Sequence, residues 1–105
     1  MLSECDNIIR MAIPAVRIAA AKALSGLGMD QSEIASNLGV AQAAVSKYLS
    51  KGYSKKIEEI EKLIESKGLQ RGVVELVRAK ADRKRILNKI DEIASSEYLL
   101  KMAQM

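Results

Sequence analysis

Apolar residues recur at intervals of three and four along most of this chain, which is the spacing of an amphipathic helix. In the segment 12–25, AIPAVRIAAAKALS, one helical face is apolar and consists of Val16, Ala19, Ala20, Ala23 and Leu24. Pro14 is tolerated near the start of a helix, and Gly26 is placed to end it. We therefore expect a core helix here that buries one face and shows Arg17 and Lys22 to solvent.

Two short helices with a sharp turn between them are expected in the middle of the chain. Asp30 is followed three residues later by Glu33, a capping-box arrangement with Asp in place of Ser or Thr, which predicts a helix to about Leu38. Gly39 can adopt the positive φ that a tight turn between crossing helices requires. The small side chain of Ala35 would let the two helix axes approach. The apolar residues that would join the helices are Ile34, Ala35, Leu38, Val40, Val45, Tyr48 and Leu49.

A further helix is expected after Ser54, which can cap the segment KKIEEIEKLIESK. Its isoleucines recur at steps of three and four, and Gly68 is placed to terminate it. Glu58 and Lys62 stand four residues apart, so an ion pair along the helix is expected.

From Gly72 onward the apolar positions lie on or near one face of a single long helical pattern, namely Val73, Val77, Ile86, Ile90, Ile93 and Leu100. A break is expected only at the sequence ASSE, where Ser95 or Ser96 could cap a last short helix. The apolar stripe thins between Val77 and Ile86, and basic residues concentrate there. Residues 78–89 contain six basic side chains and one acidic side chain, a net charge of +5 that exceeds the +4 of the whole chain.

Length and composition favour one all-α domain. The chain has 105 residues, no Phe or Trp and three Tyr, so its core must consist of aliphatic side chains, which suit closely packed small helices. Cys5 is the only cysteine and histidine is absent, which leaves too few ligands for an ordinary zinc site and removes the Ser-His-Asp and Cys-His arrangements. We therefore expect neither an enzyme nor a bound metal or cofactor.

The same composition argues against a membrane or secreted protein. No run of residues approaches the roughly 20 apolar positions that span a bilayer. The N-terminal residues MLSECDN are acidic and lack the basic region of a signal peptide. We expect a cytoplasmic location and no membrane contact.

The stretch QSEIASNLGVAQAAVSKYL, which ends at Leu49, resembles the helix-turn-helix of phage-repressor and Cro-like transcription regulators. Together with IPAVRIAAAKAL upstream, it is similar to the short predicted transcriptional regulators of archaea. The resemblance implies a helix-turn-helix domain of four to five short helices, which we place at residues 1–70. It also implies a regulator, in our reading a repressor, that binds double-stranded operator DNA as a homodimer.

The resemblance further implies which residues contact DNA. The second helix of the unit, residues 41–50, would enter the major groove and meet base edges through its outward residues Gln42, Ala43, Ser46 and Lys47. Gln42 can pair with adenine, Ala43 can touch a thymine methyl group, and Lys47 can reach guanine or a phosphate. Gln31, which opens the preceding helix, matches a position that contacts the DNA backbone.

Two features of this stretch depart from the family. Val40 and Ala41 stand where Ser or Thr is usual, so the second helix lacks a side-chain cap worth about 1 kcal/mol. Ala43 and Ala44 leave the reading face sparse, so DNA shape is expected to contribute to specificity. The alternative for the whole unit is a helical hairpin with no nucleic-acid partner.

Four residues after this unit have two interpretations each. Lys51, Lys55 and Lys56 follow the recognition helix and could contact phosphates, or they could belong to an ordinary solvated face. Tyr53 could stack on or hydrogen-bond to DNA, but a half-buried packing role is favoured.

Residues 71–105 exceed what a minimal domain of this family needs. Left uncovered, Ile86, Ile90 and Ile93 would form an exposed apolar patch, so we interpret this segment as a helical dimerisation arm. The alternative is that it folds back onto its own domain. The basic run could be the polar face of that arm or an extra phosphate-binding surface, for which the candidates are Arg83, Lys84 and Arg85.

Other functions are compatible with this pattern. An antitoxin or adaptor would bind a partner protein through residues 71–105, and a general compaction protein would bind DNA without sequence preference.

Overall fold

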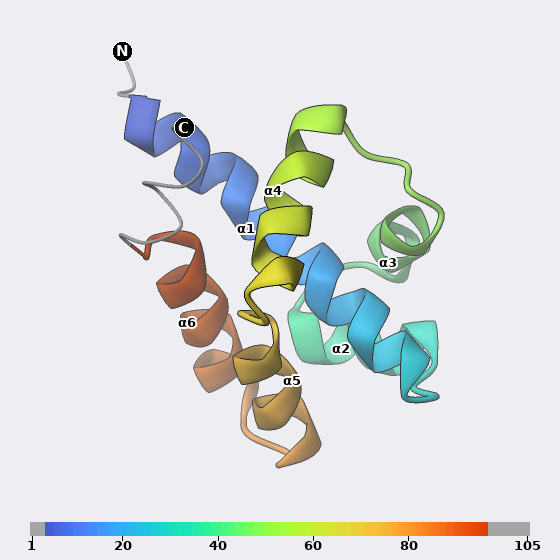
Figure 1. The fold of residues 1–105 in the computed structure, drawn as a ribbon. Coiled ribbons are helices and arrows are strands. Elements are labelled where there is room, and N and C mark those ends of the chain that lie inside the picture. Colours follow the sequence, from blue (N-terminus) through green and yellow to red (C-terminus); the bar gives the residue numbers. More distant parts are fainter. Residues whose placement is uncertain (1–3, 97–105) are drawn as a thin grey trace.

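The computed structural model describes residues 4–96, with side chains from Ile9 onward, and this part of the chain forms six α-helices and no strand (Figure 1). The helices are α1 (Glu4–Gly26), α2 (Gln31–Leu38), α3 (Gln42–Leu49), α4 (Lys55–Ser66), α5 (Arg71–Arg78) and α6 (Arg83–Ala94). The predicted all-α class is confirmed, and four of these helices, α1 to α4, lie within the first 70 residues, where four to five helices were expected. None of these helices is both long and apolar enough to cross a bilayer.

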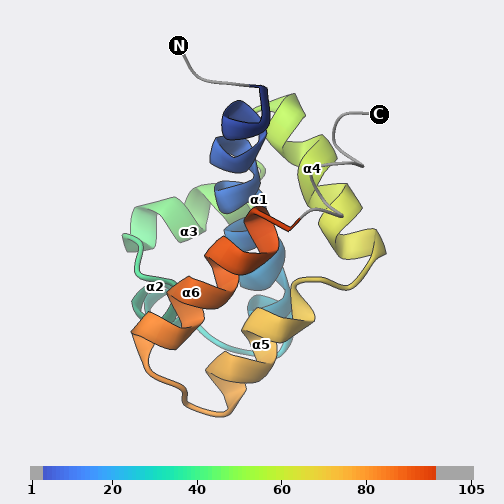
Figure 2. The same ribbon diagram turned by 90° about the vertical axis from the view of Figure 1, so that its left-hand side faces the viewer.

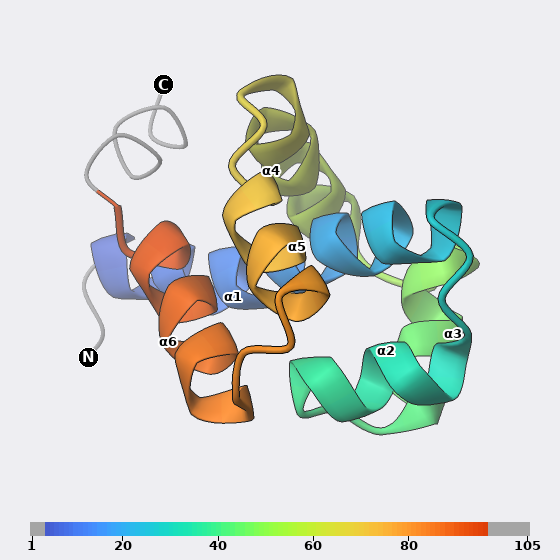
Figure 3. The same cartoon turned by 90° about the horizontal axis from the view of Figure 1, so that it is seen from below.

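α1 is the central helix, and each of the five other helices contacts it (Figure 3). Its contacts with α4, α6, α3, α2 and α5 enclose it because its buried apolar residues lie around most of its circumference. The buried positions are Ala12, Ala15, Val16, Ile18, Ala19, Ala20, Ala21 and Leu24. Most of them are alanines, whose small side chains let neighbouring helices approach closely. The expectation of one buried face is therefore wrong, and Arg17 and Lys22 are half-buried instead of lying at the solvent side.

α1 is also longer than predicted, because it begins at Glu4 and carries Pro14 in its interior. A proline there has no N–H to donate to the carbonyl of residue 10, which normally costs helix stability. The packing of the other helices around α1 offsets that local cost. Local helix propensity does not include this packing and therefore does not predict a helix through Pro14.

The elements around the central turn follow the sequence prediction closely. The Asp30 side chain accepts a hydrogen bond of 2.8 Å from the Glu33 N–H, as a cap should. Gly39 ends α2 with φ 69°, and its N–H donates to the Ala35 carbonyl. α3 begins at Gln42 with no side-chain cap, as the sequence predicted.

α4 also agrees with its predicted bounds. The Ser54 side chain accepts from the Ile57 N–H at 3.3 Å, and Gly68 lies just beyond the helix with φ 67°. The expected ion pair between Lys62 and Glu58 is present at 3.4 Å.

The C-terminal region differs from the single long helix that was predicted. α5 and α6 are separate, because Asp82 caps α6 by accepting a 2.9 Å hydrogen bond from the Arg85 N–H. Lys80, in the connection, adopts φ 58° and helps to reverse the chain. Ser95 ends α6, and its hydroxyl donates to the Asp91 carbonyl at 2.7 Å.

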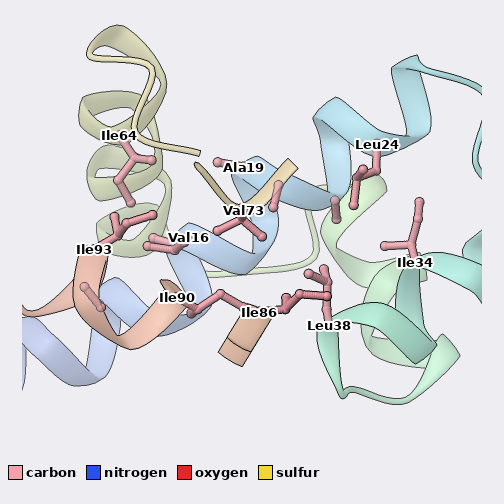
Figure 4. Packing of buried hydrophobic residues seen from close by; sticks show 14 of the residues in the cluster. Val16, Ala19, Leu24, Ile34, Leu38, Ile64, Val73, Ile86, Ile90 and Ile93 are labelled. Atoms are coloured by element: carbon pink, nitrogen blue, oxygen red, sulfur yellow. The ribbon is translucent and has the colours of Figure 1, made fainter. Parts of the chain in front are cut away.

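α5 and α6 fold back onto α1, which is the alternative interpretation of this segment. Ile86, Ile90 and Ile93 are buried in the same core as Val16 (Figure 4). The apolar face that suggested a dimerisation arm is thus covered by the chain itself. Leu100 and the predicted last helix lie outside the described residues.

Candidate nucleic-acid interface

The outward face of α3 is free of contacts with the core. Val45 is fully buried beneath it, and Tyr48 and Leu49 are half-buried against the core. The exposed residues of this helix are the four that the resemblance picked out, Gln42, Ala43, Ser46 and Lys47. Because they are one, three or four residues apart on a helix, they form one continuous surface. α3 contains no acidic residue, so nothing on this surface would repel a phosphate backbone.

α2 holds α3 at its N-terminal end. Ile34 and Leu38 are fully buried, and Ala35, which is 5% exposed, permits the close contact between the two helices. The positive φ of Gly39 turns the chain sharply between them. This turn sets the direction in which the exposed face of α3 points.

α6 supports the same turn from the other side. A Cβ atom added at Gly39 would lie 3.4 Å from Leu87 Cδ2 and 3.5 Å from Arg83 Cδ. Arg83 Nε also donates a 3.1 Å hydrogen bond to the carbonyl of Ser36, in the last turn of α2. Carbonyls in the last turn have no partner within their own helix, so this contact satisfies one of them. Sequence periodicity could not have revealed it, because the two residues are 47 positions apart.

Gln31 occupies the first position of α2 and is half-buried. Its exposed neighbours Asp30 and Glu33 are both acidic, and Asp30 is engaged in capping the helix. The predicted backbone contact at Gln31 would therefore be made next to two carboxylates, an unfavourable setting for a phosphate.

The two lysines that follow α3 are exposed. Lys51 adopts φ 62°, and Gly52 closes the end of α3 by donating from its N–H to the Lys47 carbonyl at 2.8 Å. Lys55 is the first residue of α4. Within residues 9–96 neither Lys51 nor Lys55 forms an ion pair, so both charges are available to an anionic partner.

A buried polar cluster lies beneath the loop that joins α3 to α4. Glu61 Oε2 accepts from Lys22 Nζ at 2.6 Å, and Glu61 Oε1 accepts from the Tyr53 hydroxyl at 2.7 Å. Lys22 Nζ also lies 5.7 Å from the centre of the Tyr53 ring. Tyr53 is half-buried, as favoured from the sequence, and it ties the loop after α3 to α1 and α4.

Sequence reasoning missed this cluster, although one signal was present. Glu61 stands four residues after Ile57 and three before Ile64, so helical spacing places it on the apolar face of α4. A charge at such a position needs a partner, and Lys22 on the opposing helix supplies it.

The pKa values of Lys22 and Tyr53 in this cluster are both raised. Burial alone would lower the pKa of Lys22, but its hydrogen bonds to Glu61 and Tyr53 outweigh that effect and raise the pKa above the usual lysine value. Burial raises the pKa of Tyr53; its hydrogen bond with Lys22 opposes this rise and the one with Glu61 adds to it. At neutral pH Lys22 is therefore charged and Tyr53 is neutral, as an ion pair with a structural role requires.

The candidate basic residues of α6 do not share one surface. Arg83, Lys84 and Arg85 are all exposed, and none forms an ion pair within residues 9–96. Arg83 lies toward α2, however, whereas Arg85 lines a groove between α5 and α6 together with Glu75 and Glu92. The structure thus separates residues that the sequence grouped.

Comparison with protein-family models, curated proteins and solved structures finds no match for this chain. Its function has to be argued from its own geometry and from the sequence resemblance.

Proposed function

We propose that this protein is a sequence-specific DNA-binding transcriptional regulator, in which α2 and α3 act as a helix-turn-helix and α3 enters the major groove. One observation carries the proposal. α3 is anchored through Val45 and through the turn at Gly39, while its opposite face exposes Gln42, Ser46 and Lys47 together. An α-helix with its side chains is about 10–12 Å across, which fits a major groove about 12 Å wide.

The chemistry of the exposed face supports base recognition. Gln42 lies at the first position of α3, where an amide can donate to and accept from one adenine. Ala43 presents a methyl group, which suits a thymine methyl, and Lys47 adds a positive charge. The missing side-chain cap leaves backbone N–H groups at the start of α3 open to a phosphate oxygen.

We also propose that the protein is a homodimer, and only the sequence resemblance supports this part of the proposal. Ile86, Ile90 and Ile93 pack within the chain, so they do not supply a dimer interface. The same burial weakens the alternative of an antitoxin or adaptor, because the apolar face that would bind a partner protein is already covered over residues 71–94.

The experiment that tests the function is selection of bound sequences from random duplex DNA. Wild-type protein should enrich a defined motif, and Gln42→Ala should lose preference at one base position and cost roughly 1 to 3 kcal/mol of binding free energy. Asn88→Ala, which removes an exposed amide from α6, is the matched control and should retain both the motif and the affinity. An unenriched pool, or an unchanged motif with Gln42→Ala, would contradict the proposal.

A further inference from the structure

α6 begins beside the turn that orients α3. Figures 2 and 3 show its first turn and the α2–α3 connection on the same side of the molecule. The Arg83 Nε hydrogen bond to the Ser36 carbonyl and the packing of Leu87 at Gly39 join the two elements. A duplex that contacts the start of α3 and extends over the α2–α3 turn would therefore pass the first turn of α6.

The basic side chains of α6 divide between two sides of the helix. Lys84 is exposed and stands three residues before Leu87, which packs at the α2–α3 turn, and four before Asn88, which lines the groove next to α5, so helical spacing places it between these two sides. Arg85 and Lys89 are four residues apart and both line the groove next to α5.

The electrostatic surroundings of the two sides differ as well. Glu75 and Glu92 line the same groove as Arg85, and Lys89 forms a 3.5 Å ion pair with Glu92. Lys84 forms no ion pair within residues 9–96 and does not line that groove. The nearest acidic side chain in sequence, Asp82, is engaged in capping α6. The positive charge of Lys84 is thus the less compensated one.

We propose that Lys84 contacts the phosphate backbone of duplex DNA beside the segment bound by α3, and that Arg83 is the positioning residue that fixes the first turn of α6 for this contact. Arg85 takes no part. The inference rests on the proposed function and extends it, because it adds a second element, α6, which begins 34 residues after the end of α3, to the DNA-binding surface.

The test compares Lys84→Ala with Arg85→Ala, which remove one positive charge each from adjacent positions of the same helix turn. Binding of the selected duplex and of a scrambled duplex is measured over a range of salt concentrations. Lys84→Ala should weaken both complexes alike and make the slope of log K against log salt shallower by about 0.9, the value for one lost phosphate contact. Arg85→Ala should leave the slope at the wild-type value.

A second comparison isolates the role of Arg83. Arg83→Lys keeps the charge but removes the Nε donor that bonds Ser36. In this background Lys84→Ala should change the slope by less than it does in wild type, because Lys84 is no longer held in place. A thermal unfolding midpoint within a few degrees of wild type in each variant confirms that only the contact was altered.

The outcomes separate the two proposals. If wild type binds its selected motif but Lys84→Ala and Arg85→Ala give the same slope, the inference is overturned and the proposed function stands. Full effect of Lys84→Ala in the Arg83→Lys background would overturn the positioning role of Arg83. If wild type binds neither duplex, the proposed function fails and the Lys84 contact fails with it.

Discussion

Lys22 Nζ lies 2.6 Å from Glu61 Oε2, and this ion pair joins the central helix α1 to α4. The Glu61 side chain is 1% exposed, whereas that of Lys22 is 28% exposed. Tyr53 donates to the second carboxylate oxygen, so both oxygens of Glu61 are satisfied. The pair therefore holds the loop that follows α3, and with it the C-terminal end of the candidate DNA-binding helix.

Removing the lysine should harm stability more than neutralising the glutamate. Lys22→Met leaves the buried Glu61 carboxylate without its cation, which we expect to cost about 3 kcal/mol of unfolding free energy. Glu61→Gln can still accept from Tyr53, and the partly exposed Lys22 ammonium can turn to water, so a smaller loss is expected. Urea unfolding of both variants checks this order, and equal losses would contradict it.

The pH dependence of stability follows from the same pair. The pKa values of Lys22 and Tyr53 are both higher in the folded state than in the unfolded state, where they lie near 10. The two groups therefore contribute fully to the unfolding free energy below about pH 10, and this contribution is lost as the pH rises through the folded-state values. The unfolding free energy of wild type should thus fall above about pH 10. The unfolding free energy of Glu61→Gln, measured by urea unfolding at each pH, should fall less steeply in this range. Parallel curves for the variant and wild type would show that the loss at high pH does not come from the contacts of Lys22 and Tyr53 with Glu61.

Two glycine-to-alanine substitutions should change the stability of the protein in opposite directions. Gly39→Ala places a side chain at φ 69° and should destabilise the protein by about 1 kcal/mol or more. Gly26→Ala lies in a helix with no atom within 4 Å of the added Cβ, so it should stabilise the protein by about 0.4 to 1 kcal/mol. Thermal or urea unfolding distinguishes them. A gain in stability with Gly39→Ala would mean that the turn is not the one described.

The position of α6 can be tested through its core residues. Ile90→Ala removes a side chain that is 1% exposed in the core and should cost about 2 to 5 kcal/mol of unfolding free energy. Lys84→Ala on the same helix is the exposed control and should change stability by less than about 0.5 kcal/mol. If Ile90→Ala instead altered only the molar mass from light scattering and left the unfolding midpoint unchanged, α6 would be an intermolecular arm.

The candidate site was predictable where it depends on local spacing. Helical periodicity separated Val45, which points inward, from Gln42 and Lys47, which point outward, and the structure agrees. Local spacing could not separate Lys84 from Arg85, because the side of α6 that each occupies matters only once α2 and α5 have packed on either side of it.

The sequence by itself determined the all-α class, the caps at Asp30 and Ser54, and the sharp turn at Gly39. Each of these depends on contacts between residues a few positions apart, and such contacts leave a signature in the residue types themselves.

Tertiary structure alone decided that α1 is enclosed on every side and that α5 and α6 return to its core. It also decided which charges meet, because Lys22 and Glu61 are 39 positions apart in the chain. These features arise from burial of apolar area between segments that are distant in the sequence. The hydrophobic effect is non-directional, so the residue types alone do not show which segments will pack together. Only the packed fold therefore shows that α5 and α6 fold back onto α1 and which side chains this brings together.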